Sequence, residues 1–236
     1  MSPDPPLEVT LAGAPALVVR PEGASRGAAL VFHGLGASKE VQLPELRRLA
    51  FAGFTAIGVD NVGHGARRDS DFEARLSRER ADQSFFEAVA ATAAEVRGLK
   101  DAVSERRWAE PDRIGALGIS MGAAVVFGAI ASGASLAAAV AIVGTPVWRH
   151  QSFSPHERLD AFFPTALLCI NSGNDEIVPP AGARELCREL APRYSGAPER
   201  LDFIELPGER HMMSQQAWDF ALDRAVAWFE RFLASS

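Results

Sequence analysis

The feature that most restricts the fold is a stretch without any charged side chain, which runs from Ile114 to Trp148. It is longer than the ~18 apolar residues that indicate a membrane helix. Glycine, serine and proline interrupt it at 120–122, 132–135 and 144–146, which divides it into a strand, a helix and a strand. Parallel strands that are covered on both faces are continuously apolar, and the helix between them can be nearly as apolar. The stretch therefore predicts the buried centre of a sheet.

The same alternation of apolar strands and amphipathic helices continues along the chain. A strand pair is predicted at the sheet edge, at 7–13 and 15–21, because the two segments alternate weakly around a glycine-containing turn. Further strands are predicted at 28–34, 54–60, 113–119, 135–144, 164–171 and 200–207, and helices at 39–53, 85–103, 121–132, 179–190 and 214–233. This order predicts an α/β fold with a doubly wound, mostly parallel sheet and helices on both faces.

The remaining segments fit one domain that spans residues 1–236. The charged stretch 66–82 mixes both signs and is predicted to be a solvated loop or short helix. The segment 145–163 is too short for an extended lid, so it is predicted to form a short cap-like segment.

Composition and charge exclude several classes of function. The net charge of −6 and the pI near 5.4 argue against nucleic-acid binding, which needs clustered basic residues. The first residues, MSPDPPLEVT, lack the basic and apolar regions of a signal peptide, so a cytoplasmic protein without membrane association is predicted. Cys169 and Cys187 have neither metal-ligand nor disulfide-framework spacing and are interpreted as structural thiols. Hydride transfer is disfavoured because no Gly-x-Gly-x-x-Gly motif follows the first parallel strand.

A candidate nucleophile lies in the stretch GALGISMGAA, where Ser120 stands between Gly118 and Gly122. The Gly-x-Ser-x-Gly pattern is weak alone, since a small residue in a glycine-rich bend gives it by chance. Here, however, Ser120 directly follows a predicted strand and precedes a predicted helix. That context is typical of a nucleophile elbow, a sharp turn that exposes the serine hydroxyl at the end of the sheet.

A serine nucleophile needs a base and an acid that orients the base. His211 follows the last predicted strand and is the candidate base. The other histidines are interpreted as loop-shaping residues, His33 and His64, or as surface residues, His150 and His156. Asp175 follows the strand at 164–171 and is the candidate acid, with Glu176 as the alternative.

The order along the chain of the candidate nucleophile, acid and base, Ser120, Asp175 and His211, resembles that of the α/β-hydrolase superfamily. Over nearly the whole chain from about Ala28, five segments resemble, in order, the landmarks of its small dienelactone-hydrolase-like and prolyl-oligopeptidase-like serine esterases. They are VFHGLGASKE, DNVGHGARR, GISMGAA, SGNDEIVPP and GERH. The resemblance implies an oxyanion hole formed by the backbone N–H groups of Leu35 and Met121. Dienelactone hydrolases proper use a cysteine nucleophile, so the serine here departs from that subgroup.

Together these features predict a serine hydrolase, without cofactor or metal, that cleaves small-molecule carboxylic esters through an acyl-enzyme. Thioesterase, peptidase-like and perhydrolase activities remain alternatives, as does a non-catalytic binding protein on the same fold. Trp148 is the candidate substrate-binding residue of the segment 145–163, which also contains Phe153, Phe162 and Phe163. Anchoring of this loop to the core is the alternative role for these aromatic side chains. The short segment favours an open site and short acyl groups.

Overall fold

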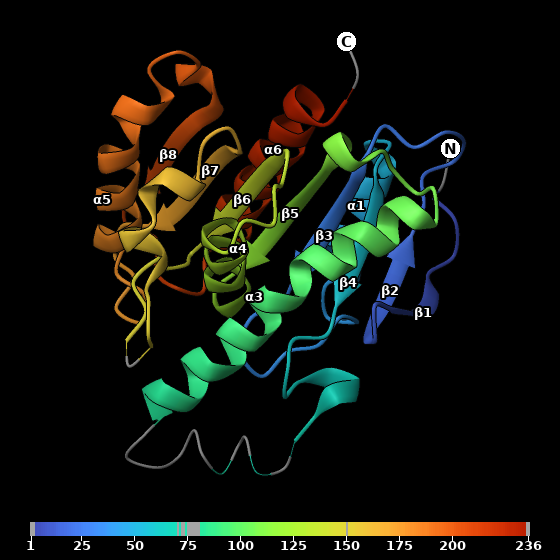
Figure 1. Cartoon of the computed structure of the whole chain (residues 1–236), viewed down its shortest axis with the longest axis horizontal. Helices are drawn as coiled ribbons and strands as arrows, with labels where there is room; N and C mark the ends of the chain where they lie inside the picture. Colours follow the sequence, from blue (N-terminus) through green and yellow to red (C-terminus); the bar gives the residue numbers. More distant parts are fainter. Residues whose placement is uncertain (1–2, 70, 72–73, 75–80, 150, 235–236) are drawn as a thin grey trace.

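One eight-stranded sheet forms the centre of the protein. The computed structural model describes residues 3–69, 71, 74, 81–149 and 151–234. Within them the strands follow the order β1-β2-β4-β3-β5-β6-β7-β8 across the sheet, as Figure 1 shows. The strands are β1 (Leu7–Leu11), β2 (Ala14–Val19), β3 (Ala28–Phe32), β4 (Thr55–Val59), β5 (Ile114–Ile119), β6 (Ala138–Ile142), β7 (Ala166–Ser172) and β8 (Leu201–Leu206).

The sheet is mostly parallel, as predicted. In their order across the sheet, the six strands from β4 to β8, with β3 among them, all pair in parallel. The predicted strand pair at the sheet edge is formed by β1 and β2, which are antiparallel, and β2 also pairs with β4 in antiparallel register. Because parallel strands direct their carboxyl ends to the same edge, the loops that follow β3, β4, β5, β7 and β8 emerge together there.

Helices cover both faces of the sheet, which makes it doubly wound (Figure 1). Helices α3 (Ala81–Glu105), α4 (Met121–Ala131) and α5 (Ala181–Leu190) contribute to the core on one face. Helices α1 (Leu43–Phe51) and α6 (Gln215–Phe232) contribute to the core on the other. Every residue of α4 is buried, so the middle of the long uncharged stretch lies in the core of the protein. Among the described residues, no helix is both long and apolar enough to cross a membrane.

Two predicted elements begin well inside their predicted bounds. The strand predicted at 135–144 is limited to β6, since Ser135 and Val143 at its two ends have positive φ angles of 52° and 46°, outside the β region. The helix predicted at 39–53 begins only at Leu43, where Pro44 occupies the first turn and needs no N–H acceptor. Most of the stretch 66–82 and His150 lie outside the described residues.

Candidate active site

Ser120 occupies a sharp turn between β5 and α4. Its backbone angles, φ 53° and ψ −110°, are unusual for a residue with a side chain. The Ser120 N–H donates to Ile142 O at 2.9 Å, which fixes the turn to β6. The flanking glycines allow the close approach that this turn needs. A Cβ at Gly118 would lie 2.1 Å from Gly122 O, and one at Gly122 would lie 2.0 Å from Phe32 O.

The structure brings Ser120, His211 and Asp175 together from three different loops. Ser120 Oγ lies 3.0 Å from His211 Nε2, and His211 Nδ1 lies 2.7 Å from Asp175 Oδ2. The Asp175 side chain is fully buried, and its Oδ1 accepts the backbone N–H groups of Ile177 and Val178 at 2.9 and 2.8 Å. With Nδ1–H donating to Asp175, His211 Nε2 is left as the acceptor that faces the serine hydroxyl.

Glu176, the alternative acid, lies away from this arrangement. Its side chain is 82% exposed, and it lies 3.6 Å from Arg210 in a surface ion pair. Asp175 is therefore the carboxylate within hydrogen-bond distance of His211 in the structure.

Met121 directly follows Ser120, and Leu35 lies in a loop that passes close to the serine. Met121 is the first residue of α4, and first-turn N–H groups have no acceptor within their own helix. The positive end of the helix dipole adds to the attraction of such groups for an anion. Leu35 lies in the loop after β3, where a Cβ on the preceding Gly34 would be 3.7 Å from Ser120 Cβ. The loop therefore runs close to the serine, with the Leu35 side chain half exposed.

Trp148 lies in the core rather than on an open surface, which favours the anchoring interpretation over substrate contact. Its side chain is buried and packs against Phe86 and Phe153, with ring centroids 6.1 and 5.7 Å apart. A Cβ on Gly128 of α4 would lie only 2.3 Å from its Cη2. The physical reason is that an indole buries more apolar area against two helices than it would in an open cleft. In the same segment Phe162 is fully buried as well.

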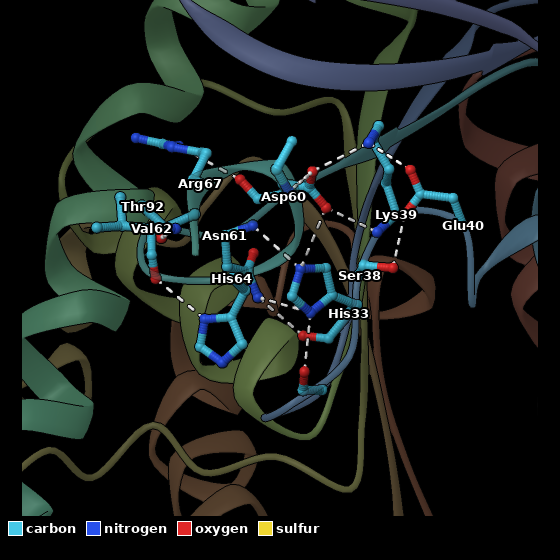
Figure 2. Close-up of polar contacts among 12 residues, drawn as sticks. His33, Ser38, Lys39, Glu40, Asp60, Asn61, Val62, His64, Arg67 and Thr92 are labelled. Atoms are coloured by element: carbon cyan, nitrogen blue, oxygen red, sulfur yellow. Dashed lines mark hydrogen bonds and ion pairs between the residues drawn. The ribbon is translucent and has the colours of Figure 1, made fainter. Parts of the chain in front are cut away.

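The remaining described histidines shape loops, with one difference from the prediction. His33 and His64 are both buried; His33 Nδ1 lies 2.8 Å from Gly34 O, and His64 Nδ1 lies 3.0 Å from Val62 O (Figure 2). Burial lowers the pKa of His33 below its ordinary value, and hydrogen bonding to Gly34 only partly offsets this. His156 was predicted at the surface but is half-buried, with Nδ1 2.8 Å from Ser154 Oγ.

Comparison with known proteins assigns the family. A family model described as serine aminopeptidase, S33, matches residues 23–165. The chain belongs to this family. As an S33 family member it is a hydrolase with the α/β-hydrolase fold, which confirms the fold and the superfamily predicted from the sequence.

Two relatives of this S33 hydrolase carry esterase names. The Bacillus subtilis (strain 168) protein named "Putative esterase YitV" is 25% identical, and the match covers 95% of this chain and 97% of that protein. Esterase YjfP of Escherichia coli (strain K12) is 24% identical, with 86% and 88% covered. The crystal structure of TT1662 from Thermus thermophilus matches with a TM-score of 0.84 and 23% identity, over 100% of both chains.

A buried carboxylate that the sequence patterns did not single out lies at the end of β4. Asp60 follows β4 directly, is fully buried, and forms an ion pair with Lys39, with Nζ 3.1 Å from Oδ2. The available signal was a carboxylate at the end of an otherwise apolar strand, FTAIGVD. Among the residues that the structure describes, no group of three His, Cys, Asp or Glu side chains could hold a metal ion.

Proposed function

We propose that this hydrolase is a serine esterase in which Ser120 is the nucleophile, His211 the base and Asp175 the acid. The observation that carries the proposal is the continuous hydrogen-bonded chain from Ser120 Oγ through both nitrogens of His211 to the buried Asp175 carboxylate. The esterase names of two relatives that match most of the chain add support.

In the proposed reaction, His211 Nε2 takes the Ser120 proton as Oγ attacks the ester carbonyl carbon. The N–H groups of Leu35 and Met121 donate to the oxyanion of the tetrahedral intermediate. Collapse of the intermediate breaks the ester bond, His211 returns the proton to the departing alcohol, and an acyl group remains on Ser120. Water, activated by the same histidine, then releases the acid and restores the serine. Asp175 stabilises the imidazolium that forms in each half of the reaction.

We propose uncharged esters with short acyl groups as substrates. Three exposed apolar side chains come from the loops that carry the proposed machinery: Leu35, Ile177 and Met212 are 49%, 71% and 85% exposed. In this proposal they offer apolar contact to an ester bound at Ser120, while the segment 145–163 is too short to enclose a long acyl chain. Each methylene gains about 0.8 kcal/mol only where a wall buries it, so kcat/KM should rise only over the first few carbons.

The test is hydrolysis of a p-nitrophenyl ester series by the wild type and by Ser120→Ala. The variant should stay folded and lose ester hydrolysis, because only the nucleophile is removed. A fluorophosphonate should label Ser120 in the wild type and leave the variant unlabelled. Substantial activity in folded Ser120→Ala would contradict the proposal, and an optimum at ten carbons or more would contradict the short-acyl assignment.

Aminopeptidase activity is the second candidate, favoured by the description of the family. The same nucleophile would attack an amide, so the two activities differ in the leaving group that they tolerate. Aminoacyl p-nitroanilides and the p-nitrophenyl esters, assayed in parallel, distinguish them. Faster turnover of the anilides would favour the peptidase.

A further inference from the structure

The Asp60 carboxylate lies between two loops that leave neighbouring strands of the sheet. One is the loop after β3, which runs from His33 to Lys39 and contains Leu35. The other follows β4 and contains Ala66. Asp60 Oδ1 accepts the Lys39 backbone N–H at 2.8 Å, and Oδ2 accepts the Ala66 N–H at 2.9 Å and the Lys39 ammonium at 3.1 Å (Figure 2). A single side chain therefore binds both loops.

The burial and charge of this pair make its contacts costly to break. A fully buried carboxylate needs hydrogen-bond donors and an opposite charge, and Asp60 has both. Lys39 is itself buried and also pairs with Glu40. Burial alone would lower the pKa of Lys39, but its hydrogen bonds to Glu40 and Asp60 outweigh this and raise the pKa above its ordinary value. Loss of one charge would leave the other poorly compensated.

The backbone of the second loop is shaped around the carboxylate. Gly65 has a positive φ of 54°, and a Cβ there would lie 2.0 Å from Asp60 Oδ1. Arg67 donates to Asp60 O at 3.3 Å and also pairs with Glu95 of α3. The loop after β4 is thereby bound both to the carboxylate, through the Ala66 N–H, and to a covering helix, through Arg67.

A second set of hydrogen bonds fixes the other end of the first loop. The Asn61 N–H donates to His33 Nε2 at 3.1 Å, and Asn61 Nδ2 donates to His33 O at 2.9 Å. Since Nε2 accepts, His33 carries its proton on Nδ1 and donates to Gly34 O. The segment with Leu35 is therefore held by Asn61 at its start and by Asp60 at Lys39.

We propose that Asp60 is a positioning residue that, through Lys39 and the loop after β4, holds the Leu35 N–H in place to donate to the oxyanion. The inference rests on the proposed esterase function. Asp60 touches no reacting atom; its effect reaches the reaction through the geometry of the loop at 33–39. Removal of one oxyanion donor typically lowers kcat by roughly 10²–10³-fold, and displacement of a donor should lower kcat by less.

The test compares Asp60→Asn and Lys39→Met with Thr165→Val as a control. Asparagine keeps the shape of Asp60 but removes its charge and one acceptor oxygen, and methionine keeps the Lys39 N–H and much of its side-chain length. Thr165 is buried just before β7, away from the carboxyl ends of the strands, where its hydroxyl donates to Leu136 O at 2.8 Å. Its loss should lower stability without moving the site.

Two measurements are made on each protein. Amide hydrogen exchange by mass spectrometry reports on the loops at 33–42 and 61–67 and does not depend on activity. Steady-state ester hydrolysis, with a trifluoromethyl ketone as an oxyanion-forming inhibitor, reports on the donor. For Asp60→Asn we expect faster exchange in both loops, kcat lowered about 10- to 100-fold, KM within about threefold, and inhibitor affinity lowered in proportion to kcat/KM.

The possible outcomes separate this inference from the proposed function. If folded Asp60→Asn matches Thr165→Val in exchange and kcat, the positioning role is wrong while the esterase proposal stands. If the wild type hydrolyses no ester but the exchange response is present, the loop contact is supported and the proposed function is wrong. If Asp60→Asn does not fold, Lys39→Met decides: we expect faster exchange at 33–42 and kcat about 3- to 10-fold lower, and wild-type values would overturn the inference.

Discussion

The packing of Trp148 on Gly128 leads to a double-mutant prediction. A Cβ at residue 128 would lie 2.3 Å from Trp148 Cη2 and 2.5 Å from Cζ2, with Ala93 Cβ next at 3.0 Å. Both indole atoms belong to the part of the ring system that phenylalanine lacks. Gly128→Ala should therefore destabilise the wild type but be tolerated when residue 148 is phenylalanine.

The magnitude follows from two opposing effects. Alanine is favoured over glycine inside a helix by about 1 kcal/mol, whereas forcing an extra methyl group into a packed core costs about 1–3 kcal/mol. Gly128→Ala alone should thus lower the free energy of unfolding by about 1 kcal/mol. Trp148→Phe loses buried area but also removes a buried Nε1–H that has no hydrogen-bond partner, so its cost should stay below about 2 kcal/mol.

Urea unfolding of the four proteins measures the coupling. The double variant should be more stable than the sum of the single changes predicts, by about 1–3 kcal/mol. Additivity within about 0.5 kcal/mol would refute the packing argument. Trp148→Ala adds a functional check: it should cost about 3–5 kcal/mol yet leave the chain-length ranking of p-nitrophenyl esters unchanged. A shift of that ranking to longer chains would restore substrate contact as the role of Trp148.

Three further changes test other contacts. Gly122→Ala should prevent native folding or lower the melting temperature sharply, since its Cβ would lie 2.0 Å from Phe32 O; near-wild-type melting would contradict this. Glu45 is buried, which raises its pKa above 4.5 despite a hydrogen bond from Trp218. Because the carboxyl group ionises less readily in the folded protein than in the unfolded chain, its ionisation destabilises the fold as pH rises. The melting temperature of Glu45→Gln should therefore exceed that of the wild type by a margin that grows from pH 5 to pH 8; a constant or shrinking margin would contradict this. Tyr194→Phe should cost about 1–2 kcal/mol in urea unfolding, because the buried hydroxyl lies 2.9 and 2.7 Å from two carbonyl oxygens; a neutral change would show that neither contact contributes.

Most of the architecture could be predicted because burial leaves a direct pattern in the sequence. Strands covered on both faces must be apolar, so β3 to β7 were recognisable as runs, and the residues that follow such strands were the natural candidates for a site. The proximity of Ser120, Asp175 and His211 followed from that logic, since all three follow strands of one parallel sheet.

Other features depend on contacts that a linear pattern does not encode. Ser135 and Val143 have positive φ angles that place them outside the strand, and neither of them is a glycine. Trp148 had two plausible roles because an aromatic residue in a loop suits a cleft and a core equally well. The pairing of Asp60 with Lys39 required knowledge of which loops meet at the edge of the sheet. Likewise, Cys169 and Cys187 are on different elements, yet their sulfur atoms lie 3.6 Å apart.

The order of strands in the sheet also has a consequence for how the chain folds. β3 lies between β4 and β5, and its pairing with β5 places Ala28 beside Ile114. Such distant partners must meet before the centre of the sheet exists, and the entropy of closing long loops slows folding. The proposed catalytic groups lie in the loops after β5, β7 and β8, so they come together only after these strands have joined the sheet. Recovery of activity during refolding should therefore trail the formation of helices, and a nascent chain gains its site only after residue 211 has been synthesised.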